Sequence, residues 1–192
     1  MVGTVIAKVA GSALGATYTM PAADGAAGEF LKTDGSTNLS FAEAGGTNTP
    51  YFYAYLSAHQ VPANNTWTKV TCDTVAFQTG STYDNTTNYR WTPGVAGKYF
   101  ISGQCEARAD TSNNMVQMDI SIYKNGSQSI SGVPVIGATG QMTRQMGHIS
   151  GIIDMNITDY VEFWGAIDTG ASNRRWDDGY QTTHFMGYKL LD

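Results

Sequence analysis

The most chemically dense stretch of the chain is the segment 173–180. It holds two arginines, two adjacent carboxylates and two aromatic rings: Arg174, Arg175, Trp176, Asp177, Asp178 and Tyr180. Carboxylate oxygens are ligands for Ca²⁺, which makes Asp177 and Asp178 candidate metal ligands. Arginines beside aromatic rings could contact an anionic or sugar ligand. The simpler interpretation, which we favour, is a solvated loop with Arg–Asp pairs. The segment 110–114 has a similar pair of interpretations: we favour a turn, and a contact surface is the alternative.

Catalytic motifs are absent from the sequence. His59, His148 and His184 form no metal-binding spacing such as HxH or HExxH. The segment 147–151 resembles a serine nucleophile motif, but its serine is out of register. No phosphate-binding loop occurs. We therefore expect no enzyme and no catalytic residue. A glycan hydrolase is the enzymatic alternative, and it would need two carboxylates about 5–10 Å apart.

The two cysteines, Cys72 and Cys105, have neither CxxC spacing nor a nearby histidine partner. We interpret them as small buried thiols. A single disulfide between them is the alternative that the sequence leaves open.

Composition narrows the class of protein. Charged residues make up 14% of the 192 residues, against roughly 25% in an average soluble chain. Uncharged polar residues, 22 glycines and 11 tyrosines suit β-strands rather than helical bundles. A net charge of −5 argues against nucleic-acid binding. We expect no membrane insertion, because no apolar run reaches the roughly 18 residues of a spanning helix. The N-terminus is a poor signal peptide, so we expect synthesis in the cytoplasm.

The sequence pattern of residues 51–192 indicates a domain of β-strands. Apolar and polar residues alternate through 98–108 and through 116–122, where Val116, Met118, Ile120 and Ile122 share one face. Such a period of two indicates half-buried strands. Further strands are expected at 51–56, 147–153, 160–167 and 184–190, with a tight turn at Asn125-Gly126. The pattern predicts an all-β fold, an antiparallel sandwich or jelly roll.

The strand 51–56 is apolar on both faces. Tyr51, Tyr53 and Tyr55 alternate with Phe52, Ala54 and Leu56. A strand of this kind lies inside a sandwich or at a subunit interface. We expect one face in the core and the tyrosine face against a neighbouring subunit.

Residues 1–50 form a different region, rich in Gly, Ala and Thr. The dipeptides Asp24-Gly25 and Asp34-Gly35 flank the extended run 29–33, and 38–41 follows, which predicts small hairpins. So few bulky side chains cannot offset the entropy of ordering such a segment alone. We expect it to be ordered by pairing with another chain.

Residues 51–192 resemble C1q/TNF-like domains. The segment 87–101 resembles their central signature, in which an aromatic is followed by Gly-x-Tyr-x-Phe. Here Trp91 stands where the family has Phe, and Ile101 replaces its second Phe. The segments 122–126, 159–163 and 185–190 are similar to the family's later strands. The resemblance implies a C1q/TNF-like jelly roll and a homotrimer. Some such trimers hold Ca²⁺ near the axis.

The N-terminal region resembles a repeat of bacteriophage fibre proteins, in which a Leu-Pro-x-x-Asp-Gly turn leads to Gly-x-x-Leu-x-Thr-x-Gly and then Leu-Ser-Trp/Phe. Residues 18–25, 28–35 and 39–41 follow that order. The resemblance implies attachment to other virion proteins through the apolar residues of the segment: Tyr18, Met20, Phe30, Leu31, Leu39 and Phe41.

Together these patterns predict a non-enzymatic virion protein. Residues 1–50 would be a trimerising stem and attachment segment, and residues 51–192 a jelly-roll knob on the virion surface. The leading hypothesis is a tail fibre or spike component that binds a host glycan or protein. The alternatives are a capsid decoration protein and a free C1q-like recognition module. We expect no cofactor apart from the weak Ca²⁺ candidate.

Overall fold

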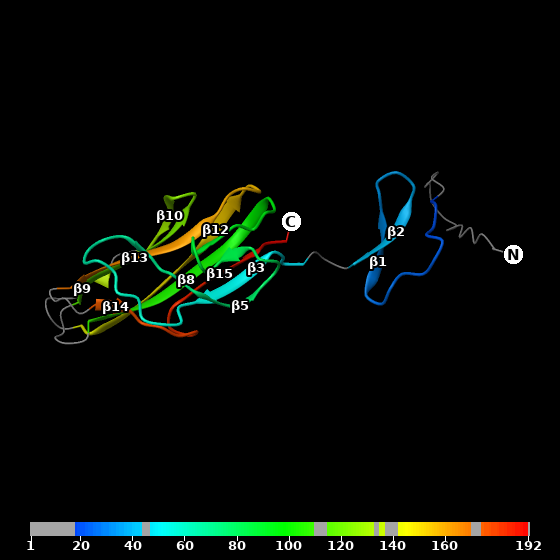
Figure 1. The fold of residues 1–192 in the computed structure, drawn as a ribbon. Helices are drawn as coiled ribbons and strands as arrows, with labels where there is room; N and C mark the ends of the chain where they lie inside the picture. The colour runs from blue at the N-terminus through cyan, green and yellow to red at the C-terminus, as the bar shows by residue number, and fades with distance from the viewer. Residues whose placement is uncertain are drawn as a thin grey trace. The chain divides into compact units, whose positions relative to one another are not determined.

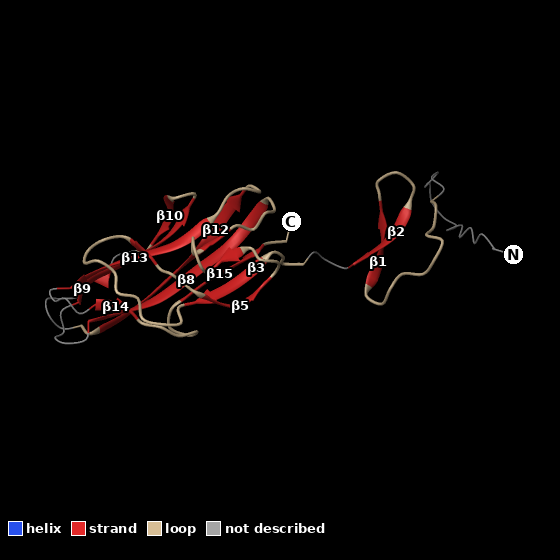
Figure 2. Ribbon diagram, viewed as in Figure 1, coloured by secondary structure: helices blue, strands red, loops and turns tan. Residues whose placement is uncertain are grey.

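The computed structural model describes residues 18–43, 47–109, 115–132, 135–136, 142–169 and 174–191. All their regular structure is β-strand (Figure 2). None of these residues belongs to a helix of the length and hydropathy that crossing a bilayer requires. The chain divides into two compact units, Met1–Gly46 and Thr47–Asp192.

The strands of the first unit, within the described residues 18–43, form a single hairpin. Strands β1 (Glu29–Thr33) and β2 (Leu39–Glu43) pair antiparallel, with Leu31 opposite Phe41 (Figure 1). The Asp34 carboxylate closes the turn by accepting hydrogen bonds from the backbone of Ser36 and Asn38. The prediction of hairpins is confirmed at Asp34-Gly35, whereas Asp24-Gly25 lies before β1 and connects no pair of strands among the described residues. No residue of 18–43 is buried in this unit by itself.

The second unit is a sandwich of two antiparallel sheets. The first sheet has the order β10-β9-β13-β7-β6, with β11 beside β9 and β4 beside β13. Its strands are β4 (Thr68–Lys69), β6 (Tyr83–Asp84), β7 (Arg90–Trp91), β9 (Met115–Lys124), β10 (Ser127–Ser131), β11 (Val135–Ile136) and β13 (Val161–Thr169).

The second sheet has the order β12-β8-β15-β3-β5, with β14 beside β8. Its strands are β3 (Tyr51–Tyr55), β5 (Thr74–Gln78), β8 (Gly97–Ala109), β12 (Arg144–Met155), β14 (Arg174–Trp176) and β15 (His184–Lys189). Figure 1 shows β8 in green between β12 and β15.

The core lies between the two sheets and is rich in aromatic rings. Phe52 packs against Tyr83, Trp91 and Phe185, with ring centroids 4.7–5.0 Å apart. Each fully buried side chain of this size contributes about 1.5–3 kcal/mol through the apolar surface that it removes from water. The alternation in β8 is confirmed on its apolar face, where Tyr99, Ile101, Cys105 and Ala107 are buried, but Ser102 and Glu106 of the polar face are buried as well.

Two glycines leave space that neighbouring groups fill, Gly103 between the two sheets and Gly187 within the second sheet. A Cβ on Gly103 would lie 2.6 Å from a ring carbon of the buried Phe163. A Cβ on Gly187 would lie 2.8 Å from Ile101 and 3.0 Å from the Phe100 carbonyl oxygen. At the other predicted turn, Asn125 and Gly126 both have positive φ, at 51° and 77°. These values are those of the tight hairpin turn that the dipeptide predicts.

The prediction for Val116 is wrong. Val116 is exposed, and Met115 takes the core position instead. The reason is a register shift where β9 pairs β13: Gln117 pairs Asp168, but the next pair joins Met115 to Thr169. An inserted residue of this kind reverses which side chains face the core beyond it.

Candidate functional site

The segment after β14 is fixed against the loop that follows β3. Gln60 and Trp176 exchange two backbone hydrogen bonds, of 3.2 and 2.8 Å. The amide of Gly179 also donates to the carbonyl of Leu56 at 2.8 Å. These bonds place His59 beside Asp177 and Asp178, although about 118 residues of chain separate them in sequence.

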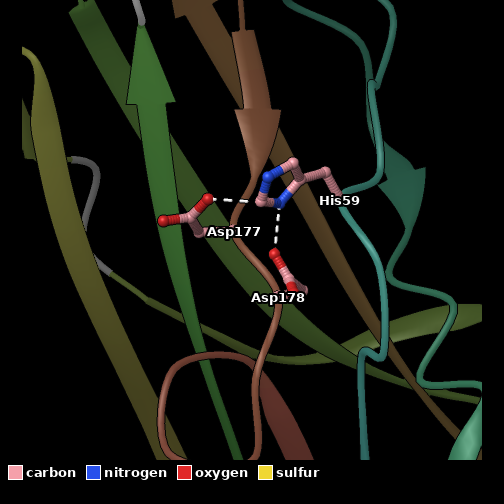
Figure 3. Close-up of side chains that lie close together, drawn as sticks. All are labelled: His59, Asp177 and Asp178. Carbon is pink, nitrogen blue, oxygen red and sulfur yellow. Dashed lines mark ion pairs between the residues drawn. The ribbon is translucent and has the colours of Figure 1, made fainter.

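The three side chains form a compact cluster (Figure 3). His59 Nδ1 lies 3.3 Å from Asp177 Oδ1 and makes a second, shorter contact with Asp178 Oδ1. The side chains of His59, Asp178 and Asp177 are 48%, 36% and 10% exposed. One ligand atom from each lies within 4.8 Å of the others. Sequence reasoning identified the two aspartates but missed His59, because nothing in the local pattern at 59 indicates its partners.

Asp177 also accepts hydrogen bonds from two arginines. Arg108 Nη1 donates to Oδ2 and Arg175 Nε to Oδ1, both at 2.9 Å. Burial by itself would raise the pKa of Asp177, but these two hydrogen bonds outweigh it and keep the pKa below its ordinary value. A third arginine, Arg144, pairs with the buried Glu106 next to this group.

The remaining predicted residues of this segment have different surroundings. Arg174 Nε donates to the Pro62 carbonyl at 2.9 Å. Tyr180 is exposed and stacks on Tyr53, with ring centroids 4.6 Å apart. Residue 173 and the predicted turn 110–114 lie outside the described residues.

Trp176 corrects the prediction of a ligand-contacting aromatic. Its side chain is fully buried. A Cβ on Gly165 would lie 2.7 Å from the Trp176 ring, so the indole fills the space which that glycine leaves. Because the ring packs inside the sandwich, it is not available to a ligand at the surface.

The donor set of the cluster does not match Ca²⁺, which takes six to eight oxygen ligands. Here one ligand is an imidazole nitrogen, and one carboxylate is already bound by two guanidinium groups. A mixed nitrogen and oxygen set is typical of zinc and the neighbouring divalent transition metals.

The predicted tyrosines lie on the face of the second sheet that points away from the core. Phe52, Ala54 and Leu56 are buried on the opposite side of the same segment. Tyr53 contacts the rings of Phe77, Tyr180 and His184, with centroids 5.4, 4.6 and 5.0 Å away. Tyr51 and Tyr188 line a shallow depression of about 440 Å³ together with Asn48 and Phe77.

A polar row crosses the middle of this face. Register pairs His148 with Gln104, Gln104 with His184, and His184 with Tyr55. His148 Nε2 and the Ser102 hydroxyl are 2.9 Å apart. His184 Nδ1 is buried and has no hydrogen-bond partner among the described residues. Burial, with a smaller contribution from His148, lowers the pKa of His184.

The Ser102–His148 pair is not a catalytic arrangement by its surroundings. Among the described residues His148 contacts the Ser102 hydroxyl rather than a carboxylate, so the carboxylate that orients the imidazole of a triad is missing from this part of the chain. Ser102 is also buried within the sheet, where a substrate carbonyl cannot approach it.

The predicted attachment residues lie on the hairpin unit. Tyr18, Met20, Phe30 and Leu31 are exposed, whereas Leu39 and Phe41 are half-buried. Phe41 covers Gly25, where a Cβ would lie 2.6 Å from its ring. The unit therefore presents more large apolar side chains than it covers.

The comparisons with known proteins concern the fold. No protein-family model matches the chain, and no curated protein matches its sequence. The globular domain of zebrafish complement 1qA aligns with a TM-score of 0.50 and 13% identity, covering 74% of this chain and 98% of that one. Murine APRIL aligns with a TM-score of 0.50 and 13% identity over 73% and 98% of the two chains.

A third similar structure is the Eiger TNF of S. frugiperda, with a TM-score of 0.52 and 7% identity over 74% of this chain and 94% of that one. Identities this low support a likeness of fold alone. The chain thus contains an antiparallel β-sandwich of the C1q/TNF-like fold, as its signature residues predict.

Proposed function

We propose that the chain is a non-enzymatic structural protein that acts as a homotrimer. The observation that carries this proposal is the outward face of the second sheet. Five large exposed apolar side chains gather there, from β3, β5, β12 and the loop before β15: Tyr51, Phe77, Met146, Ile152 and Tyr180. Large apolar side chains exposed on one sheet face, here on both sides of the polar row of His148, Gln104 and His184, favour an interaction site.

The hairpin unit supports the same proposal by a separate argument. None of residues 18–43 is buried within one chain. A segment that buries so little cannot offset its own ordering entropy, so association with other chains is the physical source of its order. Three copies could share one core around Leu31 and Phe41, which are cross-strand partners on one face of the hairpin.

We further propose that this trimer is a surface component of a bacteriophage particle, made in the host cytoplasm. The resemblance of residues 18–41 to phage fibre repeats supports this proposal. Residues 1–50 would attach it to other virion proteins, with the C1q/TNF-like domain 51–192 as an outward knob. The leading role is a tail fibre or spike component that binds a host glycan or protein. A capsid decoration protein is the alternative role.

The trimer is tested by native mass spectrometry of wild type and Tyr53→Asp. Wild type should have three times the chain mass of 20.6 kDa. Tyr53→Asp should shift the population to monomer, because it puts a charge among Phe77, Tyr180 and His184. Ile157→Asp is the matched control, since Ile157 is exposed in the turn between β12 and β13. A monomeric wild type, or an unchanged Tyr53→Asp trimer, would contradict the assignment.

The virion role is tested by immunogold microscopy of purified particles. Label at tail tips supports the fibre or spike, and label over the capsid supports a decoration protein. Particles that lack the protein by both labelling and peptide mass spectrometry would leave the free C1q-like recognition module as the better interpretation.

A further inference from the structure

We propose that His59, Asp177 and Asp178 form a binding site for a divalent transition metal ion, with Zn²⁺ as its representative. The ligands are His59 Nδ1 and one oxygen of each carboxylate, and water completes the coordination. This inference does not depend on the proposed function, since all three residues belong to one chain.

One spacing of the donor atoms fits such an ion directly. Zinc bonds to nitrogen and oxygen are about 2.0–2.2 Å long, so two ligands at a tetrahedral angle lie about 3.4 Å apart. His59 Nδ1 and Asp177 Oδ1 are 3.3 Å apart. The contact of His59 with Asp178 is shorter than that span, so the solvent-facing Asp178 side chain must rotate outward to admit the ion.

The site is held in place by its surroundings. The paired hydrogen bonds of Gln60 and Trp176 lock the two backbones that carry the ligands. Arg108 and Arg175 fix the orientation of the Asp177 carboxylate, as outer hydrogen bonds commonly do for metal ligands. His59 and Asp178 are open to solvent, which leaves an entry path and room for water.

The local charge sets the class of ion and limits the affinity. Among the described residues, Arg108, Arg144 and Arg175 pair with Asp177 or Glu106, whereas Asp178 contacts His59. The guanidinium groups beside Asp177 reduce the general attraction for a cation, so binding must come from direct bonds to the ligands. Imidazole forms such bonds with Zn²⁺, Co²⁺ and Ni²⁺ far better than with Ca²⁺ or Mg²⁺.

The test is calorimetric titration of the untagged full-length chain, stripped with chelator, with ZnCl₂. We expect one ion per chain. His59→Ala and Asp178→Asn should each weaken binding at least about tenfold. Loss of a residue that hydrogen-bonds a metal ligand commonly lowers the affinity about 10–100-fold, and loss of the ligand itself should lower it at least as much. His148→Ala, which removes another exposed histidine of the same domain, should leave binding unchanged. Circular dichroism confirms that each variant is folded.

Two further measurements sharpen the result. Co²⁺ in place of Zn²⁺ should give the visible absorption of a low-coordinate nitrogen and oxygen site, and His59→Ala should abolish it. Zn²⁺ should also raise the unfolding temperature of wild type but not of Asp178→Asn, because a ligand of the native state stabilises it.

Absence of saturable Zn²⁺, Co²⁺ and Ni²⁺ binding would overturn the proposal. So would Zn²⁺ binding that survives both His59→Ala and Asp178→Asn, since the ion would then lie elsewhere. Saturable Ca²⁺ binding that Asp178→Asn abolishes and His59→Ala leaves intact would overturn it as well, in favour of an oxygen-only site.

Discussion

At the scale of the residue, the chemical behaviour of a side chain in this protein depends more on its burial and its neighbours than on its residue type. Asp177 and Asp178 are neighbours in sequence, yet one is held by two arginines and the other faces solvent beside His59. The two cysteines show the same effect. Both are fully buried free thiols, as the sequence interpretation favoured, and burial raises the pKa of each.

The thiols should therefore be unreactive in the native protein. The thiolate is the reacting form, and burial both disfavours it and blocks the reagent. We expect Cys72 and Cys105 to remain unmodified by Ellman's reagent in buffer, and two thiols per chain to react in denaturant. Rapid labelling of either thiol in the folded protein would contradict this assignment of the core.

His184 should make stability depend on pH. Its pKa is lowered in the folded state from the ordinary value of 6.5. Below pH 6.5 the unfolded chain thus binds more protons than the folded one, so the free energy of unfolding falls as pH falls from 7. His184→Gln should reduce this loss, measured by urea unfolding at pH 7.5 and 5.5. An unchanged pH dependence in His184→Gln would show that other groups cause it.

At the scale of the element, the distance between the two sheets depends on where a glycine leaves space for a side chain of the opposite sheet. β8 can lie close to β13 because Gly103 leaves room for the Phe163 ring. The sequence predicted β8 and its buried face by alternation. It did not predict the register shift that buries Met115 in place of Val116, because a bulge depends on pairing with β13 rather than on local pattern.

Gly103→Ala should be destabilising by about 1–3 kcal/mol, the usual cost of overpacking a core. Phe163 is fully buried, so its ring can shift only against other core side chains. Gly147→Ala is the matched control, because its Cβ would meet the flexible end of Met118 at 2.8 Å. Urea unfolding should give a smaller loss for the control. Equal losses would mean that Phe163 can shift as readily as Met118.

At the scale of the whole molecule, the two units differ in how far one chain can stabilise them. The unit 47–192 contains a continuous core of aromatic and aliphatic residues. The described part of the unit 1–46 is a hairpin with no buried residue. Hairpins of two strands are marginal in water, so the proposed association with other chains would supply the order of this one.

A fragment of residues 47–192 should thus fold alone, with a cooperative thermal transition. A peptide of residues 1–46 should show none at concentrations where it is monomeric. Circular dichroism melts of the two fragments test this difference. A cooperative transition in the monomeric peptide would remove the argument that the hairpin needs other chains.

The sequence by itself determined the local structure. Alternation specified the strands, Asp-Gly and Asn-Gly specified the turns, and the aromatic signature around Trp91 specified the C1q/TNF-like sandwich. These features are readable because each depends on residues within a few positions of one another. Only the tertiary structure placed His59 beside Asp177 and Asp178, buried Trp176 and gathered the apolar side chains of several strands on one sheet face. Those arrangements depend on which distant strands pair and in what register, and no short stretch of sequence contains that information.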